Sequence, residues 1–135
     1  MYFPILRGRQ FELLALRECV NNGILSDFLI PIVEPVKVSS TFTKTLDSFV
    51  DHKHPIGVIR NPVVGKWSRE IVKTSNQKIQ KHYTELLDNK YLIETFYVTP
   101  DLGSNGVLWE NRILQFEKSI LICNQPEYIE HYEHI

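Results

Sequence analysis

The chain has few cysteines, no excess of one charge and no long hydrophobic run. Cys19 and Cys123 are its two cysteines, too few for the disulfide framework that small secreted domains use. We expect both thiols to be free and to behave as small hydrophobes, with a single bridge between them as the alternative. No window approaches the roughly 20 apolar residues that a membrane-spanning helix needs. These absences predict a cytoplasmic protein without a membrane segment.

The charge balance and the short motifs exclude several further classes. Fifteen Lys and Arg against sixteen Asp and Glu leave a formal net charge of -1, so we expect no non-specific binding to nucleic acid. Residues 1–7 lack the basic region of a signal peptide, and Pro4 interrupts their apolar run. The sequence contains no Gly-x-Ser-x-Gly, His-Glu-x-x-His or Cys-x-x-Cys motif. It therefore predicts no cofactor and no metal site.

Short apolar runs alternate with amphipathic helical patterns along the chain. Strands are predicted over 2–6, 28–33, 56–59, 91–98 and 119–123. Helices are predicted to begin near Gln10 and after Ser39 or Ser40, with a long one over 67–89 and a short one over 109–116. The expected apolar stripes are Phe11, Leu14, Ala15 and Cys19 in the first helix, widened by Leu13, Leu16 and Val20, and Phe42, Leu46, Phe49 and Val50 in the second.

Repeated strand–helix units predict an α/β domain with a mainly parallel sheet. Residues 1–135 are expected to form a single domain, with Ile5, Ile32, Val58 and Ile122 buried among helices. Two architectures accommodate these units: the N-terminal half of a (β/α)8 TIM-type barrel and an open doubly wound sheet. A half-barrel would leave strand edges unpaired, so we expect a homodimer or a partner chain that completes the barrel.

The opening of the chain resembles the beta-protein family, a bacterial and phage family named after a phage beta protein. The resemblance rests on residues 2–18, Tyr-Phe-Pro-Ile-Leu-Arg-Gly-Arg-Gln-Phe-Glu-Leu-Leu-Ala-Leu-Arg-Glu, and on residues 31–37 and 59–65. It covers roughly the first 65 residues. The resemblance implies a barrel-type α/β fold and, for some bacterial members, gene neighbourhoods suggestive of mobile elements or phage conflict. Because family members are usually longer, we expect a truncated or divergent member that ends just after a fifth strand.

Charged and polar residues cluster at the predicted carboxyl ends of the strands, where parallel α/β proteins bind their ligands. The anion-binding candidates are Arg7, Gly8, Arg9, Arg60 and Asn61, and the catalytic candidate is Glu34. Gly8 permits a tight turn, and two guanidiniums beside the amides of a helix start suit a phosphate or carboxylate. Arg7, Glu34 and Arg60 are expected to lie close together.

Each of these candidates also has a structural interpretation. Arg7 could pair with Glu34 across adjacent strands, and Arg9 with Glu12. Glu34 could belong to an Arg–Glu–Arg cluster instead of acting as a general base, and Asn61 before Pro62 could simply form a turn. The histidines at 52, 54, 131 and 134 are interpreted as a helix end and a solvated tail, and not as metal ligands.

Three functions remain open on the sequence alone. The first is an enzyme that acts on a phosphate-bearing or other anionic substrate at the strand ends. The second is a non-catalytic interaction module, an accessory component of a phage-defence or mobile-element system. The third is a structural remnant whose charges only hold the sheet together. The missing nucleophile and metal motifs favour the interaction module, with the enzyme as the alternative.

Overall fold

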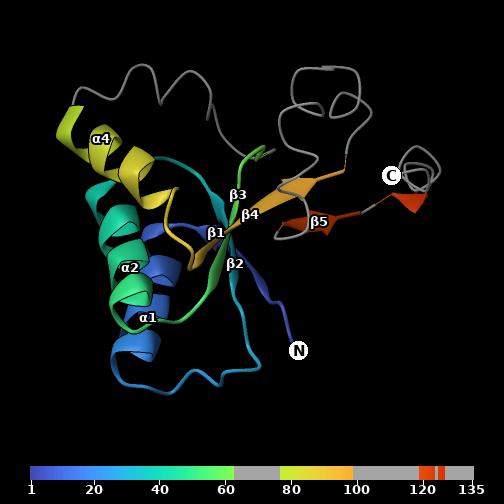
Figure 1. Ribbon diagram of the computed structural model, residues 1–135, viewed down its shortest axis with the longest axis horizontal. Coiled ribbons are helices and arrows are strands. Elements are labelled where there is room, and N and C mark those ends of the chain that lie inside the picture. Colours follow the sequence, from blue (N-terminus) through green and yellow to red (C-terminus); the bar gives the residue numbers. More distant parts are fainter. Residues whose placement is uncertain (63–76, 99–118, 124, 127–135) are drawn as a thin grey trace.

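The computed structural model describes residues 1–62, 77–98, 119–123 and 125–126, and it shows an α/β protein built on one parallel sheet (Figure 1). The sheet has five strands, whose order β1-β2-β3-β4-β5 follows the sequence. Their bounds are β1 Ile5–Gly8, β2 Ile32–Pro35, β3 Ile56–Ile59, β4 Leu92–Tyr97 and β5 Ile120–Ile122. Every neighbouring pair is parallel, which confirms the predicted fold class.

The described helices lie together on one face of the sheet (Figure 1). They are α1 (Gln10–Asn21), α2 (Ser40–Asp51) and α4 (Gln77–Leu86). A right-handed crossover between neighbouring parallel strands places each helix on the same face when the strand order never reverses. Successive units of a (β/α) barrel have this arrangement. In a doubly wound sheet the strand order reverses at one point, and here that point would have to lie outside the five described strands. The predicted helix over 109–116 and the start of the one over 67–89 lie outside the described residues.

Helix α1 begins where predicted but buries a different set of side chains. Leu13 is 1% exposed, and Leu16 and Val20 are also buried, whereas Phe11 is 83% and Leu14 is 40% exposed. The helix has two overlapping apolar stripes, and contact with α2 selects between them. The buried hydroxyl of Thr45 in α2 donates to the carbonyl of Leu13, which fixes that side of α1 against its neighbour. The predicted stripe of Phe11 and Leu14 is therefore wrong.

Helix α2 follows the prediction closely. The Ser39 side chain accepts a hydrogen bond from the amide of Phe42, as the predicted N-cap requires. Phe42, Leu46 and Phe49 are fully buried against the sheet and α1. The stripe that the sequence predicted is the face that packs, because this helix carries only one apolar face.

Strands β1 and β2 lie further along the chain than predicted. Phe28 is held in a turn, because its amide and that of Leu29 both bond to Ser26, and β2 begins only at Ile32. Arg7 and Gly8 belong to β1 and Glu34 belongs to β2, so these residues do not follow the strands as expected. Burial is confirmed for Ile32 and Val58, but Ile5 is 50% exposed and Ile122 only half-buried. Ile5 is exposed because it belongs to an edge strand.

Candidate functional site

Alternation along the strands separates the predicted site residues between the two faces of the sheet. Arg7 is the register partner of Glu34. Side chains alternate between the two faces along each strand. Leu6 and Val33 pack with the helices, so Arg7 and Glu34, one residue further along, point to the other face together with Ile5 and Ile32. Arg7 and Glu34 therefore lie on the face that none of the described helices covers, which we call the helix-free face. Neighbouring positions in register share a face, so this pair is brought together as expected.

Glu34 is 6% exposed, and its carboxylate accepts a hydrogen bond from the phenol of Tyr97 on β4, with 2.5 Å between the two oxygens. Burial, and then the hydrogen bond to Glu34 and its negative charge, raise the pKa of Tyr97 to about 12. The positive charge of Arg7 acts on this pKa in the opposite direction, which places Arg7 in the same electrostatic environment. The helix-free face thus carries a cluster of Arg7, Glu34 and Tyr97.

Arg60 belongs to the opposite face. Its guanidinium forms an ion pair with Glu94 on β4, with 2.9 Å between nitrogen and oxygen, and both side chains are about three-quarters buried. Glu94 is the register partner of Val58 and lies two residues after Leu92 on β4. Val58 and Leu92 both pack with the helices, so Glu94 lies on the face of the sheet that the helices cover. The charge of Arg60 also opposes the burial that raises the pKa of Tyr83 in α4 to about 12. Arg60 is thus turned toward α4, away from Arg7 and Glu34.

Asn61 is engaged with the backbone of Tyr97. Its side-chain nitrogen donates to the carbonyl of Tyr97 at 2.9 Å, and its side-chain oxygen accepts from the amide of Tyr97 at 2.8 Å. These two bonds extend the pairing of β3 and β4, whose last register pair is Ile59 with Thr95, to Tyr97. They use both polar atoms of the Asn61 side chain. Asn61 therefore fixes the end of β4, and with it the Tyr97 ring beside Glu34.

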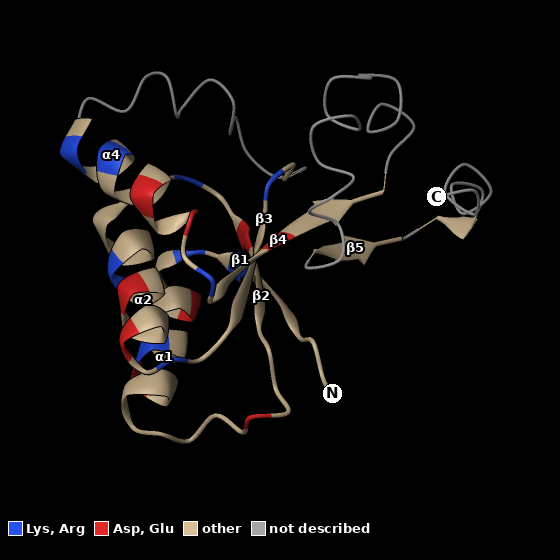
Figure 2. Cartoon of the chain, in the orientation of Figure 1, with Lys and Arg blue, Asp and Glu red and all other residues tan. Residues whose placement is uncertain are grey.

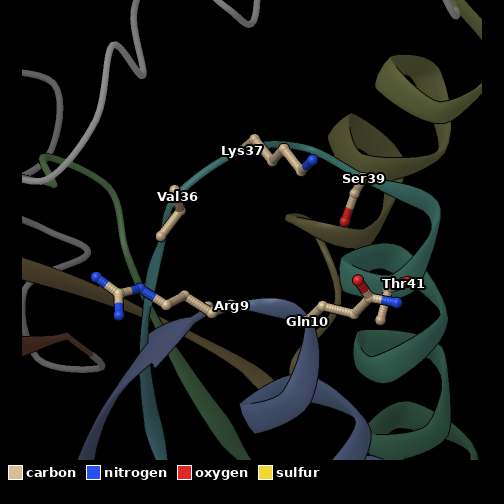
Figure 3. A pocket seen from close by; sticks show the side chains of 7 residues that line it. Arg9, Gln10, Val36, Lys37, Ser39 and Thr41 are labelled. Carbon is tan, nitrogen blue, oxygen red and sulfur yellow. The ribbon is translucent and has the colours of Figure 1, made fainter.

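A cleft of about 290 Å³ lies at the carboxyl ends of β1 and β2, where α1 and α2 begin. Its lining residues are Gly8, Arg9, Gln10, Val36, Lys37, Ser39 and Thr41. Figure 3 shows the labelled side chains standing around an opening, with Arg9 and Val36 on one side and Gln10 and Thr41 on the other. Gly8 is needed here, because a Cβ at this position would lie 3.2 Å from backbone atoms of Glu34 and Pro35.

The electrostatics of this cleft are positive. Arg9 and Lys37 are exposed, and none of the described residues that line the cleft is an Asp or a Glu. Arg9 is also the N-cap residue of α1 and makes no side-chain capping bond, so the first amides of that helix remain open to a ligand. The predicted alternative pair of Arg9 with Glu12 is not formed among the described residues, where Oε2 of Glu12 is buried without a hydrogen-bond partner.

Charges elsewhere in the described chain are mixed. Figure 2 shows both signs interspersed on α1, α2 and α4. His82 of α4 approaches both carboxylate oxygens of Asp47 of α2 at 2.8 Å, which links these helices. Within the described ranges, no group of three or more His, Cys, Asp or Glu side chains could hold a metal ion. Among those ranges, too, no helix is long and apolar enough to cross a membrane.

The histidines near the end of α2 have structural contacts. His52 is the C-cap residue, and its ring nitrogen contacts the carbonyl of Ser48. His54 is buried, packs edge-on against Phe49, and contacts the carbonyl oxygens of Pro55 and Ser26. His131 and His134 lie outside the described residues. Cys19 and Cys123 are both free.

Sequence reasoning did not identify Tyr97 as the partner of Glu34. It also did not assign to the cleft the lining residues Val36, Lys37, Ser39 and Thr41. Lys37 lies two residues beyond the end of β2, and a positive charge just after a strand could have marked it as a candidate anion ligand. Tyr97 is the last residue of β4, and its contact with Glu34 crosses the intervening strand β3. Only the strand order and register bring Tyr97 there, so no local pattern could have revealed it.

Comparisons with known proteins identify no relative. No protein-family model, curated protein or solved structure matches this chain. The function is therefore inferred from the geometry of the two sites.

Proposed function

We propose that this domain is a binding module for a phosphate-bearing or other anionic ligand, held in the cleft at the carboxyl ends of β1 and β2. The observation that carries the proposal is that Arg9, Lys37 and the open start of α1 meet around a cleft whose described lining contains no acidic residue. Amides at a helix start and two exposed cations together favour an anion.

The cleft suits a small ligand. Its volume of about 290 Å³ lies at the lower end of the range for small-molecule sites. Gln10, Ser39 and Thr41 add polar groups to the opening, although the Ser39 hydroxyl already caps α2. A phosphate monoester, or the terminal phosphate of a longer ligand, is the chemistry that these groups accommodate.

The lining residues favour binding over catalysis. The described lining residues include no Asp, Glu, His or Cys, the usual acids, bases and activated thiols. This lining supports the proposal of a non-catalytic module. The accessory role in phage defence or mobile elements, and the resemblance to the beta-protein family, remain predictions that the flanking genes would test.

The second candidate function is an enzyme that acts on an anionic substrate, with Glu34 as the acid or base. The buried Glu34 carboxylate and the Tyr97 phenol form a coupled pair at the same end of the sheet. A carboxyl group hydrogen-bonded to a phenol is the arrangement that this candidate needs for an acid or a base. The pair lies on the helix-free face, however, whereas the cleft opens at the helix starts.

Calorimetric titration with inorganic phosphate and pyrophosphate tests the binding proposal. We expect saturable binding that Arg9→Ala and Lys37→Ala each weaken by roughly tenfold, because a charge-assisted hydrogen bond contributes about 1.5 kcal/mol or more. Lys90→Ala is the matched control, since Lys90 precedes β4 at the other end of the sheet and should leave the affinity unchanged. Equal affinity in all three variants would overturn the proposal.

Glu34→Gln separates the two candidate functions. A binding module should keep its phosphate affinity in this variant, because Glu34 does not line the cleft. The enzyme requires that a phosphate ester be turned over by the unchanged protein and that Glu34→Gln abolish the turnover with little effect on binding. Turnover lost in this way would favour the second candidate.

A further inference from the structure

Strand β1 forms one edge of the described sheet, and its outward backbone groups belong to the odd-numbered residues. The amide and carbonyl of Tyr2 bond to Phe28 and Ile30, and the carbonyl of Pro4 accepts from Ile32. Even-numbered residues therefore face β2. The alternation of a strand then turns the N–H and C=O groups of Phe3, Ile5 and Arg7 away from the sheet. We call these three residues the β1 edge.

Pro4 does not protect the β1 edge. A proline blunts an edge only where its missing N–H would have pointed outward, and the backbone of Pro4 faces β2 instead. The three outward residues include no proline and no lysine. Their amides make no described hydrogen bond, so the β1 edge is able to accept another strand.

The side chains of the β1 edge are exposed and largely apolar. Phe3 is 41% and Ile5 is 50% exposed, and both share the helix-free face with Arg7. Arg7 is exposed as well and forms no described ion pair. Tyr2 and Phe28, which are joined by a backbone bond at the start of this edge, are exposed as well, at 64% and 72%. Single exposed apolar residues are ordinary, but a row of them on an open edge is typical of an interaction surface.

We propose that the β1 edge pairs with the β1 edge of a second copy of this chain, antiparallel and across a two-fold axis at Ile5. Ile5 then lies opposite Ile5 of the second copy, and Phe3 lies opposite Arg7 in both directions. All three are hydrogen-bonded pairs, which exchange two backbone bonds each. The guanidinium of Arg7 meets an aromatic ring, a favourable cross-strand contact.

This register identifies a second copy, and not an unrelated strand, as the occupant. A two-fold axis requires the edge to complement itself, and an axis at Ile5 pairs Phe3, Ile5 and Arg7 only with one another. An axis at Pro4 or at Leu6 would instead leave Arg7 or Phe3 opposite a residue outside these three. A register centred on Arg7 would place two guanidiniums opposite one another, which is destabilising. A register centred on Phe3 would leave Arg7 without a partner. The strand contact is short, so we expect a weak dimer that dissociates on dilution.

Analytical ultracentrifugation over a concentration series tests the assembly. We expect a mass that rises from 15.8 kDa toward twice that value. Phe3→Lys should raise the dimer dissociation constant on the order of tenfold by facing Arg7, whereas Phe3→Glu should keep or tighten the dimer. Phe11→Lys is the control, because it changes an exposed phenylalanine on α1 and should have no effect. Identical effects of Phe3→Lys and Phe3→Glu would overturn the proposed register.

A cross-link tests the geometry directly. A hydrogen-bonded antiparallel pair places two Cα atoms about 5.5 Å apart, within the range that a disulfide spans. In a background of Cys19→Ala and Cys123→Ser, Ile5→Cys should form an intermolecular disulfide under mild oxidation, and Phe11→Cys should not. A protein that is monomeric at all concentrations, or whose Ile5→Cys variant does not cross-link, would overturn the proposal.

Discussion

Tyr97 on β4 donates a hydrogen bond to Glu34 on β2, across the intervening strand β3. The two oxygens are 2.5 Å apart, and the carboxylate is 6% exposed. Asn61 holds the backbone of Tyr97 on both its amide and its carbonyl, so the phenol is positioned from β3 as well. The buried charge of Glu34 thus depends on three strands being in register.

Removal of this hydrogen bond should destabilise the fold. We expect Tyr97→Phe to lower the free energy of unfolding by about 1–3 kcal/mol, because a buried carboxylate loses a donor. Urea denaturation of Tyr97→Phe, Glu34→Gln and the double variant measures the coupling between the two side chains. Strictly additive effects would show that the phenol and the carboxylate do not interact in solution.

Alkaline titration should reveal two late tyrosines. Burial raises the pKa of both Tyr83 and Tyr97 from 10.0 to about 12. Because these folded values lie above the unfolded one, the contribution to stability is complete below about pH 10 and is lost as the pH rises toward 12. Tyrosinate absorbance should show a late phase that shrinks in Tyr83→Phe and in Tyr97→Phe. An unchanged late phase in either variant would contradict the assignment.

The two helix ends offer a matched pair of backbone tests. Gly23 after α1 has φ of 66° and Lys53 after α2 has φ of 53°, and both occupy the left-handed position of the same capping arrangement. Lys53→Gly should stabilise the protein by about 0.5–1 kcal/mol, and Gly23→Ala should destabilise it by about 1 kcal/mol. Thermal denaturation is the measurement. Lys53→Ala is the control, because it removes the side chain without relieving the backbone.

Gly57 on β3 should not tolerate a side chain. A Cβ at this position would lie 2.8 Å from Oγ1 of Thr95 and 3.0 Å from Cγ1 of Ile32, both of which are buried. We expect Gly57→Ala to cost about 1–3 kcal/mol by overpacking. Combining it with Thr95→Ala should cost less than the sum of the two changes. A sum that is simply additive would place the clash elsewhere.

Arg60 should prove to be structural. Its ion pair with Glu94 lies on the helix-covered face, away from the cleft. We expect Arg60→Ala to leave phosphate affinity unchanged and to lower the free energy of unfolding by about 1 kcal/mol. Calorimetry and denaturation on the same sample check both parts. A loss of affinity as large as that of Arg9→Ala would return Arg60 to the anion site.

The sequence determined the order and type of the elements. Alternating apolar runs and helical stripes predicted the parallel sheet, and Ser39 and Gly23 marked a helix start and a helix end where the structure has them. These signals are local, because a cap or a turn is decided by a few neighbouring residues. Gly8, Arg9 and Glu34 lie at or next to the carboxyl ends of β1 and β2, the region where the sequence predicted them.

Only the tertiary structure decided where the strands end and which face each side chain occupies. A parallel strand such as β2 is buried on both faces, so its apolar run carries no alternation from which a face can be predicted. A shift of one residue reverses the face of every side chain in a strand. The register therefore separated Arg60 from Glu34, brought Tyr97 to Glu34 across β3, and turned the amide of Ile5 outward. These relationships join residues far apart in the chain, and backbone pairing between strands, which no local pattern contains, sets them.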